Sequence, residues 1–409
     1  MKVIVTTSLG VAGVLLVAGI AAADEQSFQQ IERGRYLATV GDCVSCHTAP
    51  GGKSFAGGLA LETPFGSIVT PNITPDRKTG IGAWSDDDFL RAMHEGIGAD
   101  GRHLYPAFPY PSYTKVSRDD VIAIRAYLAT LEPVNHHVES NTLPFPFDIR
   151  AGMIGWNAMF FDEGRFQKDE SKSDEWNRGA YLVEGLGHCS ACHTPKNALG
   201  GDKTSVSYSG GLLQGWFAPD ITANPRYGIG GWNENDIVAY LQTGHNRNAA
   251  ATGPMLEVVE NSTSRMTQSD LRAMAVYLKT LSNQPESLPA SPDQTMMASG
   301  RMLYEGNCSA CHKASGAGVA GLFPALAGAP NVQSADATTI IRVLLQGARS
   351  AATDAAPTGP AMPAFGWKLS DDQIAAVATY IRNAWGNRGA SVAASSVSTV
   401  RSDLAEPAN

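Results

Sequence analysis

Cys43-Val44-Ser45-Cys46-His47 is the first of three copies of one short string, followed by Cys189-Ser190-Ala191-Cys192-His193 and Cys308-Ser309-Ala310-Cys311-His312. In a C-x-x-C-H string the two thiols bond to the vinyl groups of haem, and the histidine ligates the iron. The chain has six cysteines, and all of them lie in these strings. The sequence therefore predicts three covalent haem c groups. The predicted attachment residues are Cys43, Cys46, Cys189, Cys192, Cys308 and Cys311, and the predicted iron ligands are His47, His193 and His312.

Two other uses of such strings fit the sequence less well. A structural zinc site needs four ligands, usually from paired Cys and His clusters. Each string supplies three, and no cysteine lies elsewhere to complete a site. A redox-active C-x-x-C pair belongs to a βαβ context, which the sequence lacks.

Length and composition indicate a globular, multidomain chain. Its 409 residues suffice for about two to four domains, and the three strings favour three. The net charge is −8, and we find no basic patch of the kind that binds nucleic acid. Nucleic acid is therefore not an expected partner.

The N-terminus has the pattern of a secretory signal. Lys2 precedes an apolar stretch from Val11 to Ile20, and Ala21-Ala22-Ala23 offers a cleavage site. A retained anchor is the alternative, but a spanning helix needs about 20 apolar residues. We expect cleavage after residue 23 and a periplasmic protein, because haem is attached to such strings outside the bacterial inner membrane. Membrane association is expected to be peripheral, at the outer face of that membrane.

Similar segments surround the strings, as in an internal repeat; we call these parts of the chain the first, second and third repeat. Arg33–Leu37 and Arg178–Leu182 precede two of the strings, and Gly80–Asp88 and Gly228–Asp236 follow them. The later segments each place a Ser or Asn cap before acidic residues, so each opens a helix. We expect these helices to end at glycines, namely Gly96 and Gly244.

A further amphipathic helix closes each repeat, with apolar residues recurring at three and four positions. The predicted closing helices are Asp119–Leu131, Ser269–Leu281 and Ser370–Trp385, with Ser117, Ser269 and Ser370 as N-caps. The predicted domains are 24–165, 166–288 and 289–388, after a signal peptide of residues 1–23 and before a disordered tail of residues 389–409.

A haem that transfers electrons usually has a second axial ligand, Met or His. No histidine follows the third string, and Met362 is the one methionine in the long loop before the last helix. Met362 is therefore the predicted ligand there. In the second repeat Met255 is predicted, with Met266 as its competitor, while Met274 lies inside the closing helix and is interpreted as a core residue.

The first repeat departs from this pattern. A similar spacing from His47 leads to Phe108, which cannot bind iron. Met153, in a stretch that could fold back over the haem, is the preferred sixth ligand. His103 is the second candidate, and an iron left open on this side is the third. Two residues on a predicted helix, interpreted as packing or surface residues, are Met93 and His94.

The order of the strings and the segment Trp176–Cys189 resemble one known family, the triheme cytochrome c subunits of bacterial periplasmic dehydrogenases. Members serve gluconate 2-dehydrogenase, membrane-bound alcohol dehydrogenase and related sugar and polyol dehydrogenases. Asn72–Pro75, Met255–Val259 and Met362–Ser370 fit the same family. The resemblance implies an all-α fold of three tandem class I cytochrome c domains, each wrapped around its haem.

The same resemblance implies an electron-transfer subunit that is not catalytic alone. Its electrons would come from a catalytic subunit of flavin, PQQ or molybdenum type and pass to ubiquinone, a terminal oxidase or another cytochrome. One departure concerns the partner: many members carry Met where this chain has Phe108. The Phe version resembles triheme subunits of molybdenum hydroxylases of the nicotinate or isoquinoline type, which is the alternative function.

Two other classes remain as rivals. A peroxidase-like haem enzyme needs an open iron beside an acid or base, and only the first haem could serve. A soluble shuttle without a fixed partner is the third class. The chain has no nucleotide-binding G-x-G-x-x-G pattern after a strand. The tryptophans interpreted as haem-pocket or propionate contacts are Trp84, Trp156, Trp232 and Trp367.

Overall fold

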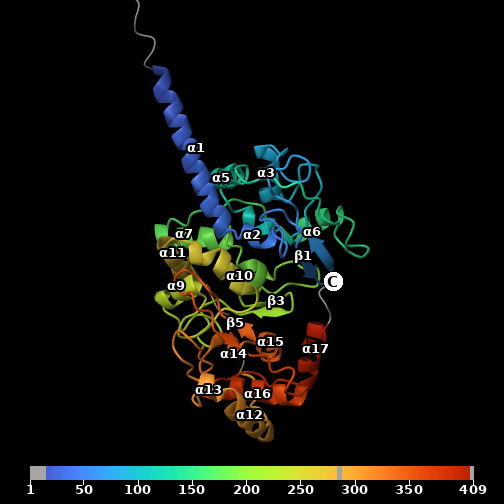
Figure 1. Ribbon diagram of the computed structural model, residues 1–409, viewed down its shortest axis with the longest axis vertical. Helices are drawn as coiled ribbons and strands as arrows, with labels where there is room; N and C mark the ends of the chain where they lie inside the picture. Colours follow the sequence, from blue (N-terminus) through green and yellow to red (C-terminus); the bar gives the residue numbers. More distant parts are fainter. Residues whose placement is uncertain (1–14, 283–287, 406–409) are drawn as a thin grey trace, which may run out of the picture.

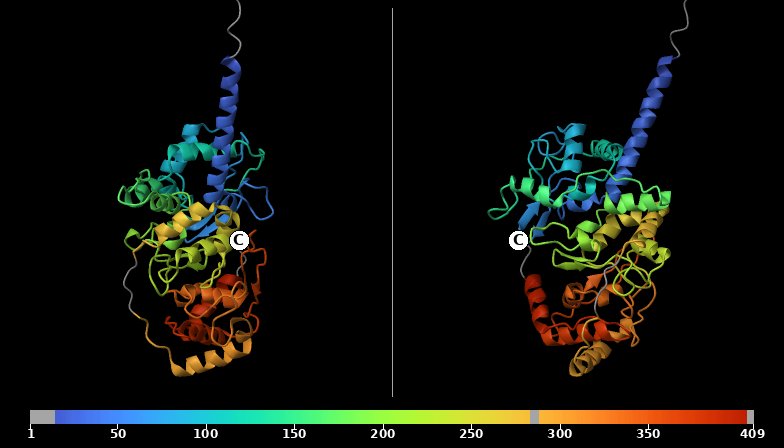
Figure 2. Two further views of the ribbon diagram at one scale, coloured as in Figure 1. Left: turned by 90° about the vertical axis from the view of Figure 1, so that its left-hand side faces the viewer. Right: turned by 180° about the vertical axis from the view of Figure 1, so that it is seen from behind.

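The computed structural model describes residues 15–282 and 288–405. The repeats are stacked along the long axis of the molecule (Figure 1). The second repeat lies between the first and the third in all three views (Figures 1 and 2). Helix α1 (Leu15–Val40) runs out from the first repeat beyond the body of the protein. Among the described helices, none is both long enough and apolar enough to cross a membrane.

One crossing of two helices recurs in each repeat, as the repeated sequence predicts. The helix before the haem string packs against the helix that closes the repeat, with apolar side chains between them. The pairs are α1 with α5 (Arg118–Leu128), α7 (Asp174–Glu184) with α11 (Gln268–Leu278), and α12 (Gln294–Asn307) with α16 (Asp371–Asn383).

Glycine lets the paired helices approach closely. A Cβ atom at Gly34 would lie 1.8 Å from the carbonyl oxygen of Ala123, so a larger residue there would push α1 away from α5. The same relation recurs at 1.9 Å between Gly179 and Ala273 and at 2.2 Å between Gly300 and Ala376.

Each haem string forms a single helical turn directly after the first helix of its pair. These turns are α2 (Cys43–Cys46), α8 (Ser190–His193) and α13 (Ser309–His312). Downstream, α3 (Asp86–Glu95) and α9 (Glu234–Thr243) begin with capping boxes and end at glycines with positive φ, as predicted. In the third repeat the corresponding helix is α15 (Thr338–Gln346), which ends at Gly347.

The predicted caps of the closing helices are confirmed at Ser117 and Ser370 and wrong in the second repeat. There Thr267 is the N-cap, and its hydroxyl accepts a hydrogen bond from the backbone N–H of Asp270. Ser269 lies inside the first turn instead. Both residues carry a hydroxyl, so residue type alone could not separate them.

The fold is helix-rich, which is consistent with the predicted class, and it also contains short β-hairpins. Three small antiparallel sheets pair β1 (Ala60–Thr63) with β2 (Gly66–Val69), β3 (Gly211–Leu213) with β4 (Trp216–Ala218), and β5 (Ala348–Arg349) with β6 (Ala361–Met362). The remaining elements are α4 (Tyr110–Tyr113), α6 (Gly152–Phe160), α10 (Pro254–Asn261), α14 (Pro330–Gln333), and the 3₁₀ turns Thr204–Val206 and Thr263–Arg265.

The predicted disordered tail is wrong for residues 394–405, which form α17 (Ala394–Ala405). Val397 and Val400 are buried in the apolar core of the third repeat. Arg401 donates to a carboxylate oxygen of Asp371 and to the carbonyl of Leu369. The small polar composition of the segment hid two valines spaced to share one helix face.

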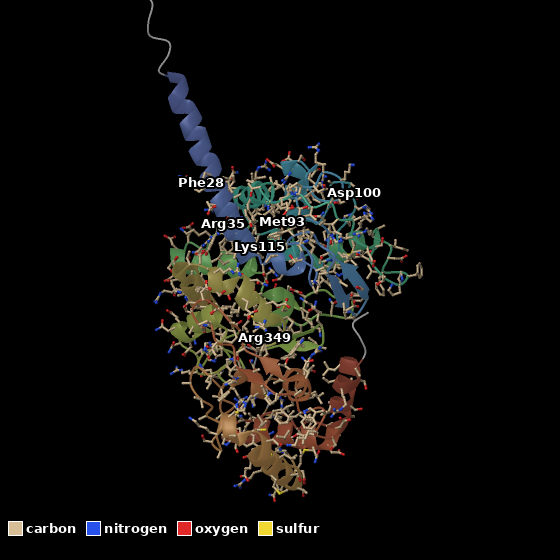
Figure 3. All side chains as sticks on the ribbon, in the orientation of Figure 1. Phe28, Arg35, Met93, Asp100, Lys115 and Arg349 are labelled. Carbon is tan, nitrogen blue, oxygen red and sulfur yellow. The ribbon has the colours of Figure 1, made fainter. Side chains whose placement is uncertain are left out.

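The first and second repeats share one apolar core, whereas the third has its own. The third repeat docks on the second through a small apolar cluster, in which Ala351 packs with Ala251, Leu256 and Val259, and through polar contacts. Arg349 (Figure 3) makes two hydrogen bonds to the carboxylate of Glu260, at 2.6 and 2.9 Å. Thr339 exchanges hydrogen bonds with the backbone of Phe217, and Arg342 stacks on the ring of Trp216.

Candidate haem sites

The six cysteines are free, in adjacent pairs, at the three helical turns. Burial raises the pKa of the Cys43 thiol to about 12 and that of the Cys308 thiol to about 11. Burial thus disfavours the thiolate form of these side chains. No cluster of three or more His, Cys, Asp or Glu side chains arranged for a metal ion occurs among the described residues.

Each of the three motif histidines makes the same kind of hydrogen bond, from its Nδ1 to the backbone carbonyl of a proline. Nδ1 of His47 lies 2.8 Å from the carbonyl oxygen of Pro71, Nδ1 of His193 lies 2.7 Å from that of Pro219, and Nδ1 of His312 lies 3.0 Å from that of Pro324. A carbonyl only accepts, so Nδ1 carries the proton and Nε2 keeps its lone pair.

Burial lowers the pKa of all three imidazoles. A neutral ring whose Nδ1–H is held by a backbone carbonyl presents Nε2 in a fixed orientation, as metal-ligating histidines do. These residues therefore fit haem iron. Sequence reasoning missed the prolines. The parallel stretches Thr70–Thr74 and Ala218–Thr222 were the available signal.

Buried nitrogen atoms without a protein partner support the same fit. Nε1 of Trp232 and Nε of Arg125 are two such atoms in the described part of the chain. Buried donors in native proteins are nearly always paired, so an acceptor from outside the polypeptide belongs beside them. Haem brings two propionate carboxylates. Trp367 is 83% exposed in the polypeptide alone, and its predicted role as a haem-pocket or propionate contact stays a prediction.

The methionines predicted as second ligands lie as follows. Met362 is on β6, partly buried against the core of the third repeat. Met255 is on α10, partly buried beside two apolar clusters. Met266 and Met274 are buried in the core shared by the first two repeats, which agrees with the interpretation of Met274 as a core residue.

In the first repeat Phe108 packs against the core, edge-on to the ring of Tyr113. Met153 is the buried residue of α6, a helix held against Tyr110 by the hydrogen bond from Tyr110 to Asn157. His103 has a buried Nδ1 without a protein partner among the described residues. The residues interpreted as packing are buried: Met93 in the core, and His94 with Nε2 2.9 Å from the carbonyl oxygen of Val116.

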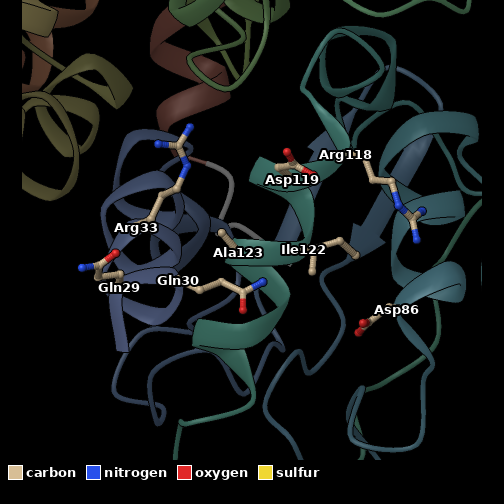
Figure 4. Close-up of a pocket in the computed structure, with 8 residues that line it drawn as sticks. All are labelled: Gln29, Gln30, Arg33, Asp86, Arg118, Asp119, Ile122 and Ala123. Carbon is tan, nitrogen blue, oxygen red and sulfur yellow. The ribbon is translucent and has the colours of Figure 1, made fainter. Parts of the chain in front are cut away.

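A shallow open depression of about 450 Å³ lies on the outer surface beside α1 and α5 (Figure 4). Its lining mixes charges of both signs, including Arg33, Arg118, Asp86 and Asp119. It contains none of the haem-string residues.

The helix crossings, cysteine pairs and oriented histidines define a c-type cytochrome with covalent haem c. Residues 31–132 and 297–385 match the Cytochrome c family. The gluconate 2-dehydrogenase cytochrome c subunit of Pantoea cypripedii is 39% identical over 406 residues, covering 94% of this chain and 92% of that protein. The cytochrome c subunit of alcohol dehydrogenase (quinone) from Gluconobacter oxydans is 37% identical over 403 residues, covering 94% and 84%.

The chain belongs to the family of cytochrome c subunits of bacterial dehydrogenases, which are electron-transfer subunits working with a catalytic dehydrogenase. A nicotinate dehydrogenase subunit of Pseudomonas putida is 43% identical over 365 residues, or 87% of this chain. This chain spans only 30% of the length of that protein.

Proposed function

We propose that this chain is a triheme cytochrome with one haem c at each string, carrying electrons from a dehydrogenase that oxidises a sugar acid, alcohol or polyol to ubiquinone or the respiratory chain. The three histidine–proline hydrogen bonds carry this proposal, because the same tautomer is fixed beside each cysteine pair. When bound, haem supplies one-electron chemistry at iron. The chain supplies attachment, axial ligands and burial, which set each haem's potential.

Three class I domains are part of the proposal. We retain the boundaries 24–165 and 166–288, and we extend the third domain from residue 289 to the end of α17. The recurrence of one helix crossing with one glycine contact supports this division. Because the second repeat lies between the other two, its haem would pass electrons between the first and the third haem (Figure 2).

Mass spectrometry of the mature protein tests the haem count. We expect three haem additions after loss of residues 1–23, a segment of which residues 1–14 lie outside the described residues. A variant with Cys308→Ala and Cys311→Ala should carry one haem fewer. Two or fewer haems on the unaltered chain, in cells able to attach haem, would contradict the proposal.

We propose His47, His193 and His312 as proximal ligands and Met362 and Met255 as distal ligands. The partly buried position of both methionines at the edge of a haem-repeat core supports this assignment. For the first haem we retain Met153. The unpaired Nδ1 of His103 favours that residue as the second candidate.

For the catalytic partner, similarity over nearly the full length of a gluconate 2-dehydrogenase cytochrome subunit favours a flavin- or PQQ-dependent dehydrogenase. A molybdenum hydroxylase is the second candidate, favoured by Phe108 and by the 43% identity to a nicotinate dehydrogenase subunit. Affinity purification from native membranes, followed by assays for flavin, PQQ and molybdenum, separates them. A cytochrome purified without any catalytic subunit would instead favour a free shuttle.

We propose a periplasmic location, peripheral to the outer face of the inner membrane, with ubiquinone, a terminal oxidase or another cytochrome as acceptor. The predicted signal and the covalent haem sites support this location. Fractionation tests it: the protein should leave spheroplast membranes in high salt or mild detergent and be accessible to protease from outside. Retention in the cytoplasmic fraction would contradict it.

A further inference from the structure

The boundary between the first and second repeats brings two haem strings close together. Asp42 and His188 directly precede Cys43 and Cys189, and both adopt left-handed backbone conformations, with φ of 50° and 35°. The pKa of the Cys46 thiol is raised to about 11, mainly by burial and also by the nearby Asp42 carboxylate and Cys192. A Cβ atom at Gly41 would lie 3.5 Å from Sγ of Cys43 and 3.5 Å from Cδ2 of Leu186, so the segments that lead into the two strings are in contact across this boundary.

Tyr113, the last residue of α4, lies between the two strings. Its side chain is 6% exposed, and its ring is edge-on to that of His188, with 5.6 Å between centroids and an angle of 79°. Burial raises the pKa of Tyr113 well above its ordinary value, and nearby Cys43, Cys46 and Asp42 raise it further. One ring thus lies beside the first string and also contacts the residue that precedes the second.

The contact is held from both sides. Nδ1 of His188 lies 2.7 Å from the carbonyl oxygen of Leu186, which fixes the imidazole. On the other side Phe108 packs edge-on against Tyr113, with 5.3 Å between centroids. Edge-to-face pairs at such distances are favourable aromatic contacts. Phe108, Tyr113 and His188 therefore form a continuous aromatic row from the core of the first repeat to the second string.

The contact that the second repeat makes with the first string is polar. Asn261, at the end of α10, donates from Nδ2 to Oγ of Ser45 at 2.8 Å, and Ser45 donates to Asp42 at 2.6 Å. The aromatic row therefore reaches from the first repeat to the second string, and no equivalent row among the described residues reaches from the second repeat to the first string. It uses side chains that the repeated sequence does not duplicate, since Thr263 follows α10 where Tyr113 ends α4.

We propose that the ring of Tyr113, edge-on to His188, carries the electronic coupling between the first and second haem sites. Electrons tunnel better through packed atoms than across gaps, and this buried ring packs against His188 at the start of the second string. One electron leaves the donor site, which is oxidised, and the acceptor site is reduced by one electron. Tyr113 keeps its electrons and its hydroxyl proton throughout, so it is a bridging residue. The inference rests on the haem attachment proposed above.

The test compares Tyr113→Leu, which removes the ring, with Tyr113→Phe, which keeps it. The intact holoprotein is reduced by a flash with a ruthenium photosensitiser, and redistribution of the electron between the first and second haems is followed optically. We expect a severalfold slower redistribution in Tyr113→Leu and an unchanged rate in Tyr113→Phe. His188→Leu should slow it as well. Tyr127→Leu is the matched control, because Tyr127 also lies near Cys43 but stacks on Phe55 within the first repeat.

Three further readouts separate bridging from a structural role. Haem count by mass, midpoint potentials by redox titration, and exciton coupling in the Soret circular dichroism report attachment, driving force and haem–haem geometry. Slowed redistribution with all three unchanged supports the proposal. An unchanged rate in both Tyr113→Leu and His188→Leu overturns it and assigns the crossing to the Cys46–Cys192 edge. Slowing that accompanies lost exciton coupling in both leucine variants also overturns it, because the rings then only place the haems. Absence of haem from the unaltered protein would instead refute the proposed function.

Discussion

Tyr36 of the first repeat donates a hydrogen bond to Asp270 of the second, with 2.6 Å between Oη and Oδ2. The relation is reciprocal, because Tyr181 of the second repeat donates to Oδ2 of Asp120 in the first, also at 2.6 Å. Each aspartate also binds an arginine of its own repeat. These arginines are Arg33 for Asp120 and Arg178 for Asp270. The first two repeats are thus related by an approximate two-fold arrangement.

Tyr36→Phe should lower the free energy of unfolding by about 1–3 kcal/mol, because it removes a hydrogen bond to a charged and buried acceptor. Burial raises the pKa of Tyr36, so its hydroxyl remains a donor at neutral pH. Denaturant unfolding of the holoprotein measures the change. Tyr127→Phe is the control, since that ring packs edge-on against Phe55. An equal loss in both variants would mean that the general effect of removing a tyrosine hydroxyl, and not the bond to Asp270, is being measured.

His94 makes stability depend on pH. Its side chain is 2% exposed, and burial together with the charge of Arg165 lowers its pKa to about 4. In the unfolded chain a histidine titrates near pKa 6.5, so between about pH 6.5 and 4 the unfolded state binds more protons. The free energy of unfolding therefore falls as the pH decreases through this window, at about 1.4 kcal/mol per unit of pKa difference.

His94→Gln should flatten that dependence, because glutamine does not titrate and still offers a donor to the carbonyl of Val116. Unfolding measured at several pH values between about 4 and 7 provides the comparison. His137→Gln, at an exposed position, should leave the slope as in the unaltered protein. A slope insensitive to His94→Gln would assign the acid sensitivity to other groups.

Helix α17 is an integral part of the third repeat. Val397 is fully buried against that core, so Val397→Ala should cost about 1–3 kcal/mol through lost burial and the cavity left behind. Ser398→Ala, one position along at an exposed site, should change stability by less than about 0.5 kcal/mol. Thermal unfolding of the third-repeat transition measures both. Equal stability of the two variants would place α17 outside the cooperative unit.

The helices were predictable because they depend on local patterns. The strings, the capping boxes at Ser85 and Asn233, and the apolar spacing of the closing helices all lie within short windows of sequence. The backbone acceptors of the motif histidines were missed, because every residue has a carbonyl oxygen. Only the parallel stretches around Pro71 and Pro219, 24 and 26 residues after His47 and His193, marked them. The contact of Tyr113 with His188 depends on how two repeats pack, which neither repeat encodes alone.

Met362→Ala and Met255→Ala should each remove one methionine-ligated haem while leaving all haems attached. Loss of the thioether removes a ligand that raises the potential, so one midpoint potential should fall. The sulfur-to-iron near-infrared band and redox titration report the loss. Met274→Ala, within the core, is the control and should leave that band intact. If Met255→Ala leaves the band unchanged, Met266 becomes the ligand of the second haem.

The first haem should differ from the other two, because Phe108 occupies the position of a ligand and packs against the core. Phe108→Met should offer the first iron a thioether at the position that the spacing from His47 predicts, and should therefore shift the first haem's potential. Removing each candidate side chain in turn identifies the native sixth ligand of the first haem. We expect Met153→Ala to convert the first haem to high spin, seen in the electronic spectrum and in electron paramagnetic resonance.

His103→Ala is the matched variant for that test, because the unpaired Nδ1 of His103 is the competing donor. If only His103→Ala produces the high-spin signal, the histidine is the ligand and the assignment of Met153 is wrong. If neither variant changes the spectrum, the first iron is open on this side in the unaltered protein. That outcome predicts rapid reaction with hydrogen peroxide, and stopped-flow mixing of the fully reduced protein with peroxide would detect it as fast oxidation of the first haem alone.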